Sequence, residues 1–200
     1  MNDATDCWDR ETLGVSGCQR CSSLVESRSQ IVDGVGPTDT NLLFVGEAPG
    51  ANEDEQGEPF VGRSGTVLDT ELRDAGIPRA DVRITNCVRC RPPENRDPTV
   101  TEREHCRTYL NQEITAVDPE LVVTLGKVPA EHLLDRSVAV TSEAGNIDEI
   151  DAGETSYPVL ICVHPAATLY DPNQSDVFEK TLRAAAEHAG DGGQSALDEF

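Results

Sequence analysis

Residues 41–65 read NLLFVGEAPGANEDEQGEPFVGRSG, and this stretch determines what kind of fold to expect. The apolar run NLLFVG (41–46) ends in glycine, which is typical of a central parallel strand that leads into a loop. After the loop, RSGTVLDTELRDAG (63–76) has apolar residues at helical spacing and ends in glycine. The stretch therefore predicts a strand, a loop and a helix in that order.

Strand-like apolar runs alternate with helical segments along the rest of the chain. Thr101 and Glu104 are spaced as a capping box at the start of one helix. Further strands are expected at 81–88, 120–126 and 158–165, helices at 99–117, 127–135 and 175–188, and weak strands and turns at 137–157. This alternation with short loops predicts a three-layer α/β/α sandwich around a mostly parallel sheet.

The length of 200 residues, of which 37% are hydrophobic, suits one domain with a single core. We expect a flexible amino-terminal segment (1–16), a single domain (17–189) and a disordered tail (190–200). No apolar run approaches the roughly 18 residues of a membrane span, and the amino terminus lacks the basic start and apolar stretch of a signal peptide. These features predict a monomer without a membrane segment, located in the cytoplasm.

The formal net charge is −21, and Lys127 and Lys180 are the only lysines. An acid-rich, lysine-poor composition suits a very salty cytoplasm and predicts a halophilic source. Such a charge argues against a nucleic-acid partner, because proteins bind phosphate backbones through Lys and Arg. At molar ionic strength, however, the Debye length is about 3 Å, so only local arginines matter. The net charge therefore does not decide the partner.

Seven cysteines are many for a cytoplasmic protein of this length, and in a reducing compartment they indicate metal or cluster ligation before disulfides. Two assignments are open. Cys18-x2-Cys21 with Cys87-x2-Cys90 has the paired spacing of a zinc site. Alternatively, Cys18, Cys21, Cys90 and Cys106 are spaced like the ligands of an iron–sulfur cluster, with Cys87 inside a strand. Spacing alone does not choose between them.

The loop after the first strand is glycine-rich, but it lacks the lysine of a P-loop and the glycine spacing of a dinucleotide site. Asp54, Glu55 and Glu58 fit a solvated acidic loop. Glu47 directly follows the strand beside Gly46, and this rigid position favours a functional role. The glycines would let the backbone approach a flat or neutral ligand, while carboxylates hold a water molecule or a proton.

In a mostly parallel sheet, ligands bind at the carboxyl ends of the strands. Phe60, in the acidic loop, is either a core residue or a stacking platform for a planar ligand. Asn86 ends the strand at 81–88 and can offer a donor and an acceptor at once, as base-edge recognition requires. His164 precedes Pro165 at the end of the last strand, which aims an imidazole at the same edge.

Five blocks of sequence occur in order between about Cys18 and Leu182: CQRC with SRSQIVDGVG, GEAPGANEDEQGEPFVGRSG, ITNCVRCRPPENRDPTVTEREHC, LVVTLGKVPAEHLL and VHPAATLYDP. Together they resemble the family 4 uracil-DNA glycosylases of bacteria and archaea, enzymes that carry a [4Fe–4S] cluster. The resemblance implies a central four-stranded, mostly parallel sheet flanked by helices. It also implies a DNA-repair enzyme that flips uracil out of DNA and hydrolyses its N-glycosidic bond, leaving an abasic site.

The resemblance implies which cysteines bind the cluster. Cys18, Cys21, Cys90 and Cys106 would be its ligands, and Cys87 stands where the family typically has an aliphatic core residue. The cluster would tie the amino-terminal segment to the 90–106 loop. Zinc is the alternative occupant.

The resemblance also assigns the substrate site. Gly46 would belong to the substrate site, Phe60 would stack on the extruded uracil, and Asn86 would read the N3 and O4 edge of the base. His164 would contact the O2 side and stabilise the negative charge that develops on the departing base.

Two carboxylates and two apolar side chains complete this assignment. Glu47 and Glu53 belong to the end of the pocket that positions water, because a carboxylate tolerates a cationic sugar. Leu169 and Tyr170 would wedge into the base stack, although family members often have a basic residue where this chain has Tyr170.

Two other functions stay open at this point. The chain could be a non-catalytic metal-binding module associated with DNA, in which the acidic loop is solvated surface. It could also be a glycosylase for another deaminated base, such as hypoxanthine or xanthine. The expected partners are uracil-containing DNA and other base-excision-repair proteins.

The charge makes a first prediction, on salt dependence. We expect the fold to weaken in dilute buffer, because carboxylates then repel one another over longer distances, and to strengthen at molar salt. Thermal unfolding followed by circular dichroism at a series of KCl concentrations measures this. A melting temperature that is equal in dilute buffer and in molar KCl would contradict the halophile interpretation.

Overall fold

Five strands form the central sheet, in the order β4–β3–β5–β7–β6. The computed structural model describes residues 7–194, so residues 1–6 of the expected flexible segment and 195–200 of the expected tail lie outside the described part. Four neighbouring strands are parallel, and β6 pairs antiparallel with β7 at one edge. The strands are β3 (Leu42–Gly46), β4 (Arg83–Asn86), β5 (Leu121–Leu125), β6 (Ile147–Ala152) and β7 (Thr155–Cys162).

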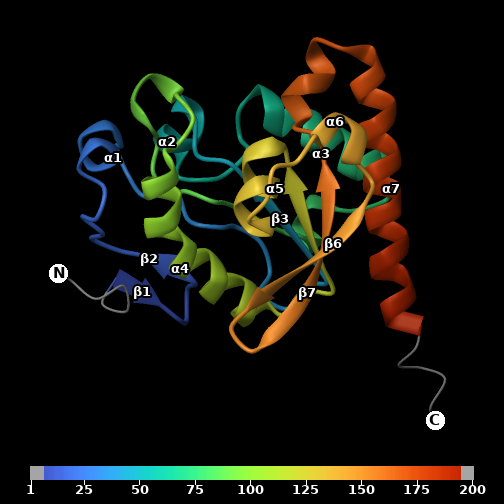
Figure 1. Ribbon diagram of the computed structural model, residues 1–200, viewed down its shortest axis with the longest axis horizontal. Coiled ribbons are helices and arrows are strands. Elements are labelled where there is room, and N and C mark those ends of the chain that lie inside the picture. Colours follow the sequence, from blue (N-terminus) through green and yellow to red (C-terminus); the bar gives the residue numbers. More distant parts are fainter. Residues whose placement is uncertain (1–6, 195–200) are drawn as a thin grey trace.

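Helices cover both faces of this sheet. Figure 1 shows α4 and α7 on opposite sides of it. Helices α4 (Val100–Val117) and α5 (Lys127–Leu134) pack on one face, and α3 (Arg63–Asp74) and α7 (Pro172–Gln194) pack on the other. The expected three-layer α/β/α class is confirmed, but the sheet has five strands instead of four. The fifth is β6, in a region where the sequence indicated only weak strands and turns.

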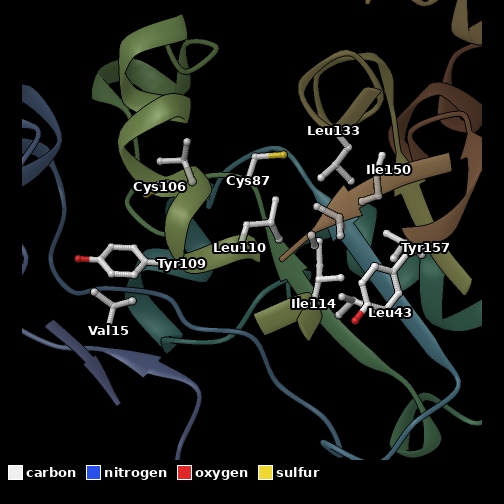
Figure 2. Close-up of a cluster of buried hydrophobic side chains, with 14 of the residues drawn as sticks. Val15, Leu43, Cys87, Cys106, Tyr109, Leu110, Ile114, Leu133, Ile150 and Tyr157 are labelled. Atoms are coloured by element: carbon white, nitrogen blue, oxygen red, sulfur yellow. The ribbon is translucent and has the colours of Figure 1, made fainter. Parts of the chain in front are cut away.

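Alternating side chains of the strands feed two separate cores. Leu43 and Val45 of β3 point to the α4 face, whereas Leu42 and Phe44 point to the α3 and α7 face. Figure 2 shows the α4 side of this arrangement, in which Leu110 and Ile114 of α4 lie against the sheet. Burial on both faces explains why the strands read as continuous apolar runs.

Shorter elements surround the sheet. They are β1 (Trp8–Asp9), β2 (Gly14–Val15), α1 (Ser22–Ser27), α2 (Ala51–Gln56) and α6 (Val140–Glu143), with 3-10 turns η2 (Arg79–Asp81), η3 (Pro93–Asn95) and η4 (Pro165–Leu169). Among the described residues, every helix is too short or too polar to span a bilayer.

The amino-terminal residues form a hairpin instead of an extended tail. Strands β1 and β2 pair antiparallel, and Trp8 stacks on Tyr109 of α4 with ring centroids 6.1 Å apart. Val15 is buried in the same core. At the other end, α7 continues to Gln194, past the expected end of the domain at 189. The domain limits themselves stay a prediction.

Helix α4 starts with a different capping box from the expected one. Thr99 is the N-cap, its hydroxyl oxygen accepts the backbone N–H of Glu102, and the carboxylate of Glu102 accepts the backbone N–H of Thr99. The pair Thr101 and Glu104 was therefore wrong by two residues. Both pairs have the spacing of a capping box, and Pro98 places the helix start at the earlier one because it holds the preceding chain extended.

A buried carboxylate joins α4 to β4. Glu113 is 0% exposed, and its two oxygens accept hydrogen bonds from Arg83 Nε and Arg89 Nη2, each at 2.6 Å. Arg89 also donates to Asp33 at 2.7 Å, and Asp33 accepts the backbone N–H of Val15 at 3.0 Å. The two arginines are at most 3% exposed, so the network ties the hairpin, the 33–36 segment, β4 and α4 together inside the core.

The backbone next to Glu113 needs a glycine. A Cβ on Gly34 would lie 2.1 Å from Glu113 Oε1, and the carbonyl oxygens of Gly34 and Gly36 accept from Arg83 at 3.1 Å and 2.8 Å. Every donor of the ion network that the structure records therefore faces an acceptor, as a buried charge requires.

The ion network makes a second prediction. Replacing Glu113 with Gln should lower the free energy of unfolding by about 3–5 kcal/mol, because the buried Arg83 loses its counter-charge and Arg89 loses one of its two carboxylate partners. Urea unfolding at constant molar salt measures this. Glu104→Gln is the matched control, because Glu104 is an exposed residue of the same helix and its loss should change little. Similar unfolding midpoints for the two variants would contradict the role of Glu113.

Candidate active site

A cavity of about 180 Å³ opens at the carboxyl edge of the sheet. Pockets for drug-sized ligands measure roughly 300–1,000 Å³, so this one suits a single small ring. Its lining is Glu47, Ala48, Gly50, Glu53, Phe60, Ser64, Asn86 and His164. The structure therefore brings together five of the predicted site residues, which come from three loops far apart in the sequence.

Gly46 forms the floor behind this cavity. It is the last residue of β3 and pairs with Asn86 at the end of β4. A Cβ at this position would lie 2.4 Å from Asn86 Oδ1 and 2.5 Å from Phe60 Cε2, so another residue would push both side chains away. A glycine is needed here because the two side chains approach the backbone closely.

Phe60 is held in an uncommon backbone conformation, with φ at 55°. The residue is 6% exposed, and a Cβ on Gly65 would lie 1.8 Å from its carbonyl oxygen. Its ring faces that of His164, with centroids 6.0 Å apart and an angle of 35° between the planes. Packing on both sides thus fixes the ring at the wall of the cavity.

Asn86 presents an amide to the cavity from the end of β4. The residue is 3% exposed and lines the cavity. Within residues 7–189, no protein group hydrogen-bonds this amide, so its donor and its acceptor are both available to a ligand. The backbone around it is rigid, because the N–H of Cys87 donates to the carbonyl of Gly46 at 2.9 Å.

His164 follows β7 and caps η4. Its Nδ1 accepts the backbone N–H of Ala166 at 3.1 Å, so a neutral ring carries its proton on Nε2. Burial lowers the pKa of His164, with Glu53 acting in the opposite direction, and the ring is therefore neutral at pH 7. Gly126, at φ 110°, makes room for it, since a Cβ there would lie 3.1 Å from His164 Cβ. Nothing in the sequence pattern singled out Gly126.

Glu47 is the titratable carboxyl of the cavity. Burial raises its pKa to about 7, aided by the charge of Asp97 and a hydrogen bond with it, while Arg103 acts in the opposite direction. A carboxyl with this pKa can change protonation state near neutral pH. Neither Asp97 nor Arg103 was selected from the sequence, because their proximity to Glu47 depends on how the 88–98 loop and α4 fold back.

Glu53 closes the acidic loop on itself. Its Oε2 accepts the backbone N–H of Gly50 at 3.1 Å, and its Oε1 accepts that of Gly62 at 3.0 Å. Both oxygens are thus engaged by backbone groups from the two ends of the loop. This geometry favours a role in holding the loop around the cavity.

The remaining carboxylates of the loop differ from one another. Glu55 and Glu58 are exposed, in keeping with a solvated acidic loop. The same expectation for Asp54 was wrong: it is 2% exposed, and both its oxygens accept the backbone N–H of Ser29 at 2.9 Å. Asp54 therefore anchors the segment after α1 to the acidic loop, a contact that sequence spacing does not reveal.

Leu169 and Tyr170 stand beside the cavity instead of inside it. They are 42% and 80% exposed, unusual values for large apolar side chains. They line a second hollow of about 340 Å³ that shares Glu53 and Ser64 with the first. Ser64 lies between the two hollows, and its sequence context did not mark it, because a serine in the first turn of a helix is ordinary.

The four predicted cluster ligands also meet in one place. Cys18, Cys90 and Cys106 belong to one buried cluster, with Cys21 packed against it. Burial raises the pKa of Cys21, Cys90 and Cys106 to about 11 each, and each is raised further by charge on other members of this set. The charges of these four residues thus act on one another's pKa.

The surroundings of these thiols suit an anionic group. Arg28 Nη1 donates to Cys90 Sγ at 2.8 Å, and His105 Nδ1 lies 3.3 Å from Cys21 Sγ. Burial would raise the pKa of Cys18, but the nearby polar groups of Arg20 and Tyr109 outweigh this and lower it. These polar neighbours favour the thiolate, the form that binds metals, at Cys18, whereas burial favours the protonated thiol at Cys21, Cys90 and Cys106.

Cys87 differs from the four. It is 1% exposed in the core between α4 and the sheet (Figure 2), and burial strongly raises its pKa. Among the described residues, no three His, Cys, Asp or Glu side chains are arranged to hold a single metal ion. The four thiols are therefore not drawn together as tightly as the ligands of one zinc ion.

Comparisons with known proteins agree with this geometry. The family model of the uracil DNA glycosylase superfamily matches residues 34–186. A type-4 uracil-DNA glycosylase of Archaeoglobus fulgidus is 38% identical over 180 residues, which cover 88% of this chain and 90% of that protein. A type-4 uracil-DNA glycosylase of Thermotoga maritima is 40% identical over 156 residues, which cover 78% of this chain and 79% of that protein. A type-5 uracil-DNA glycosylase of Pyrobaculum aerophilum is 29% identical over 205 aligned positions, which cover 86% of this chain and 89% of that protein. On this evidence the chain belongs to the uracil-DNA glycosylase superfamily and, within it, to the type-4 uracil-DNA glycosylases.

Proposed function

We propose that this protein is a DNA-repair hydrolase that flips uracil out of DNA and cleaves its N-glycosidic bond, leaving an abasic site. One observation carries the proposal: a cavity sized for one small ring gathers Glu47, Phe60, Asn86 and His164 in a chain of the type-4 family. Uracil arises in DNA by deamination of cytosine. Extrusion costs a few kcal/mol and costs least at a mismatch, so a U·G pair is the preferred substrate.

The walls of the cavity select the base. Phe60 stacks on the ring of uracil, and Gly46 lets both Phe60 and Asn86 lie against the backbone beside it. The amide of Asn86 accepts from N3–H and donates to O4. Cytosine reverses this pattern with an unprotonated N3 and an N4 amine, and it would leave the buried amide unpaired.

His164 stabilises the leaving base. As the bond breaks, negative charge develops on the uracil ring, and the Nε2–H of a neutral imidazole donates to O2. The hydrogen bond from Ala166 to Nδ1 keeps the proton on Nε2, so the donor is already oriented before the substrate arrives. The charge is stabilised without a change in the protonation state of the histidine.

Glu47 acts on the sugar side. The sugar acquires oxocarbenium character, and a carboxylate both orients the attacking water and tolerates that positive charge. Both oxygens of Glu53 are held by backbone N–H groups, so we assign the water-positioning role to Glu47 and give Glu53 the role of holding the loop that carries it.

Leu169 and Tyr170 engage the DNA stack next to the cavity. Their exposure suits side chains that are buried when DNA is bound. Leu169 fills the space vacated by the flipped nucleotide, and the Tyr170 ring stacks on a neighbouring base. The Tyr170 ring thus contacts the base stack at a position where the positive charge of a basic residue would be screened by the salt of the cytoplasm.

A [4Fe–4S] cluster fits the four thiols better than zinc does. Cys18, Cys21, Cys90 and Cys106 would hold it, because they share one buried, arginine-lined site and are not arranged around a single ion in the described part of the chain. When bound, the cluster supplies a cross-link between the amino-terminal segment and the 90–106 loop. We leave Cys87 out of the set because the family resemblance places an aliphatic core residue at its position, and Cys87 is 1% exposed.

The setting of the enzyme follows from its composition. We infer a halophilic source, a cytoplasmic location that keeps the thiols reduced, and a monomer that acts on uracil-containing DNA together with other base-excision-repair proteins. The domain is taken as 17–189, with the hairpin of residues 7–16 packed on it.

The glycosylase assignment makes a third prediction. The protein should release uracil from a U·G duplex at molar salt, and kcat/KM should rise with pH to a plateau above about 7, because the Glu47 carboxylate is the active form. Glu47→Gln should lower the rate by about 10²–10⁴-fold and remove this rise. Glu58→Gln, in the exposed part of the same loop, is the control and should keep both.

The same assay separates the other functions. Uracil, hypoxanthine and xanthine are placed at one position of one oligonucleotide. Preferential release of a base other than uracil would move the assignment to another deaminated base. DNA binding without release of any base, with Glu47→Gln indistinguishable from the native chain, would indicate the non-catalytic module.

The ligand set makes a fourth prediction. Cys90→Ser should abolish the visible charge-transfer absorbance of the anaerobically purified protein and lower its soluble yield, because one of four cluster ligands is lost. Cys87→Ala is the control and should retain the absorbance. An unchanged spectrum for Cys90→Ser, or loss of absorbance in both variants, would reject this assignment.

A further inference from the structure

Three buried donor atoms next to the four cysteines have no partner in the described part of the chain. They are Arg20 Nε, Arg20 Nη2 and Tyr109 Oη. Buried polar groups in folded proteins nearly always have a hydrogen-bond partner, and an exception calls for an explanation such as an ion. Both side chains lie beside Cys18 and lower the pKa of its thiol, so the acceptors that these donors face are the sulfur atoms of the four-thiol site.

Arg20 is fixed in this position by aromatic rings. Its guanidinium carbon lies 4.2 Å from the centroid of the Tyr109 ring, and Tyr109 in turn stacks on Trp8 of the hairpin. Such a cation–π contact orients the planar guanidinium and leaves its N–H groups directed outward in the plane. In Figure 2, the Tyr109 side chain extends from α4 away from the sheet, toward the blue amino-terminal part of the chain.

Arg28 approaches the same group from the end of α1. Its Nη1 donates to Cys90 Sγ at 2.8 Å and its Nη2 to the carbonyl oxygen of Cys18 at 2.7 Å. The fork of this guanidinium thus spans two ligands that lie 72 residues apart, from 18 to 90. The chain has a net charge of −21 and only 16 lysine and arginine residues, and two of its arginines lie at this one site.

We propose that Arg20 and Arg28 donate hydrogen bonds to the sulfur atoms of the iron–sulfur cluster and thereby set its reduction potential and its retention. This inference rests on the proposed cluster. A [4Fe–4S] core with four thiolates is an anion, and its reduced form carries more negative charge. Hydrogen bonds to the sulfurs stabilise the reduced form more than the oxidised form and therefore raise the potential.

The test compares the native chain with Arg20→Met, Arg28→Met and a control, all purified anaerobically. Met keeps the approximate length of the side chain and removes its donors and charge. The control is Arg73→Met, which removes one exposed arginine of α3, 71% exposed, and so matches the change in net charge. The reduction potential is measured by titration followed with electron paramagnetic resonance, and retention by loss of visible absorbance in excess chelator.

We expect both Arg20→Met and Arg28→Met to shift the potential to more negative values and to lose the cluster about 10–100-fold faster, as the loss of groups that support metal ligands typically does. Arg73→Met should match the native chain. Potentials and rates of loss that are equal in all four proteins would overturn the proposal. A shift of the same size in Arg73→Met would also overturn it, because net charge would then explain the effect.

A second measurement covers variants that fail to fold. Native protein grown with ¹⁵N-labelled arginine is reduced and studied by pulsed electron–nuclear double resonance. Coupling of guanidinium ¹⁵N and of exchangeable protons to the cluster supports the proposal, and its absence overturns it. None of these readouts uses excision of uracil. Failure of the proposed hydrogen bonds would therefore leave uracil release intact, whereas failure of the proposed function would abolish uracil release and leave the cluster measurements intact.

Discussion

Glu113 is buried in the core, and its two salt bridges connect parts of the chain that each hold candidate functional residues. Arg83 starts β4, the strand that ends at Asn86, while Arg89 lies one residue before Cys90, one of the four proposed cluster ligands. Glu113 itself lies about two turns after Cys106 on α4. A buried carboxylate is tolerated only when it is fully paired, so the relative placement of β4 and α4 is confined to the one that satisfies it.

The same network connects the cavity to the thiols. Through Asp33 it reaches the backbone of Val15 and so holds the hairpin whose Trp8 supports Tyr109 and Arg20. The network thus links β4, which carries the Asn86 amide, to the hairpin that packs beside the four thiols.

Carboxylates in the acidic loop serve three different physical purposes. Glu47 is partly buried and its pKa is raised to about 7. Both carboxylate oxygens of Glu53 accept hydrogen bonds from backbone N–H groups, and Asp54 holds the segment after α1 through the N–H of Ser29. Only the exposed members serve as solvated surface. Composition alone does not reveal these different roles, because in a protein of such high negative charge most acidic residues are expected to lie on the surface.

The sequence by itself was enough to predict the three layers, the mostly parallel sheet and most of the candidate residues that line the cavity. Apolar runs ending in glycine, asparagine or histidine mark strands whose carboxyl ends share an edge, so the sequence pattern alone groups Glu47, Phe60, Asn86 and His164. Other features depended on contacts between distant segments: the antiparallel β6, the cap at Thr99, the burial of Asp54, and the approach of Asp97 and Arg103 to Glu47. Periodicity reports which face of an element is apolar, because that is a property of neighbouring residues. Which polar groups meet inside the core is decided only when the layers pack, since the partner of each charge lies tens of residues away along the chain.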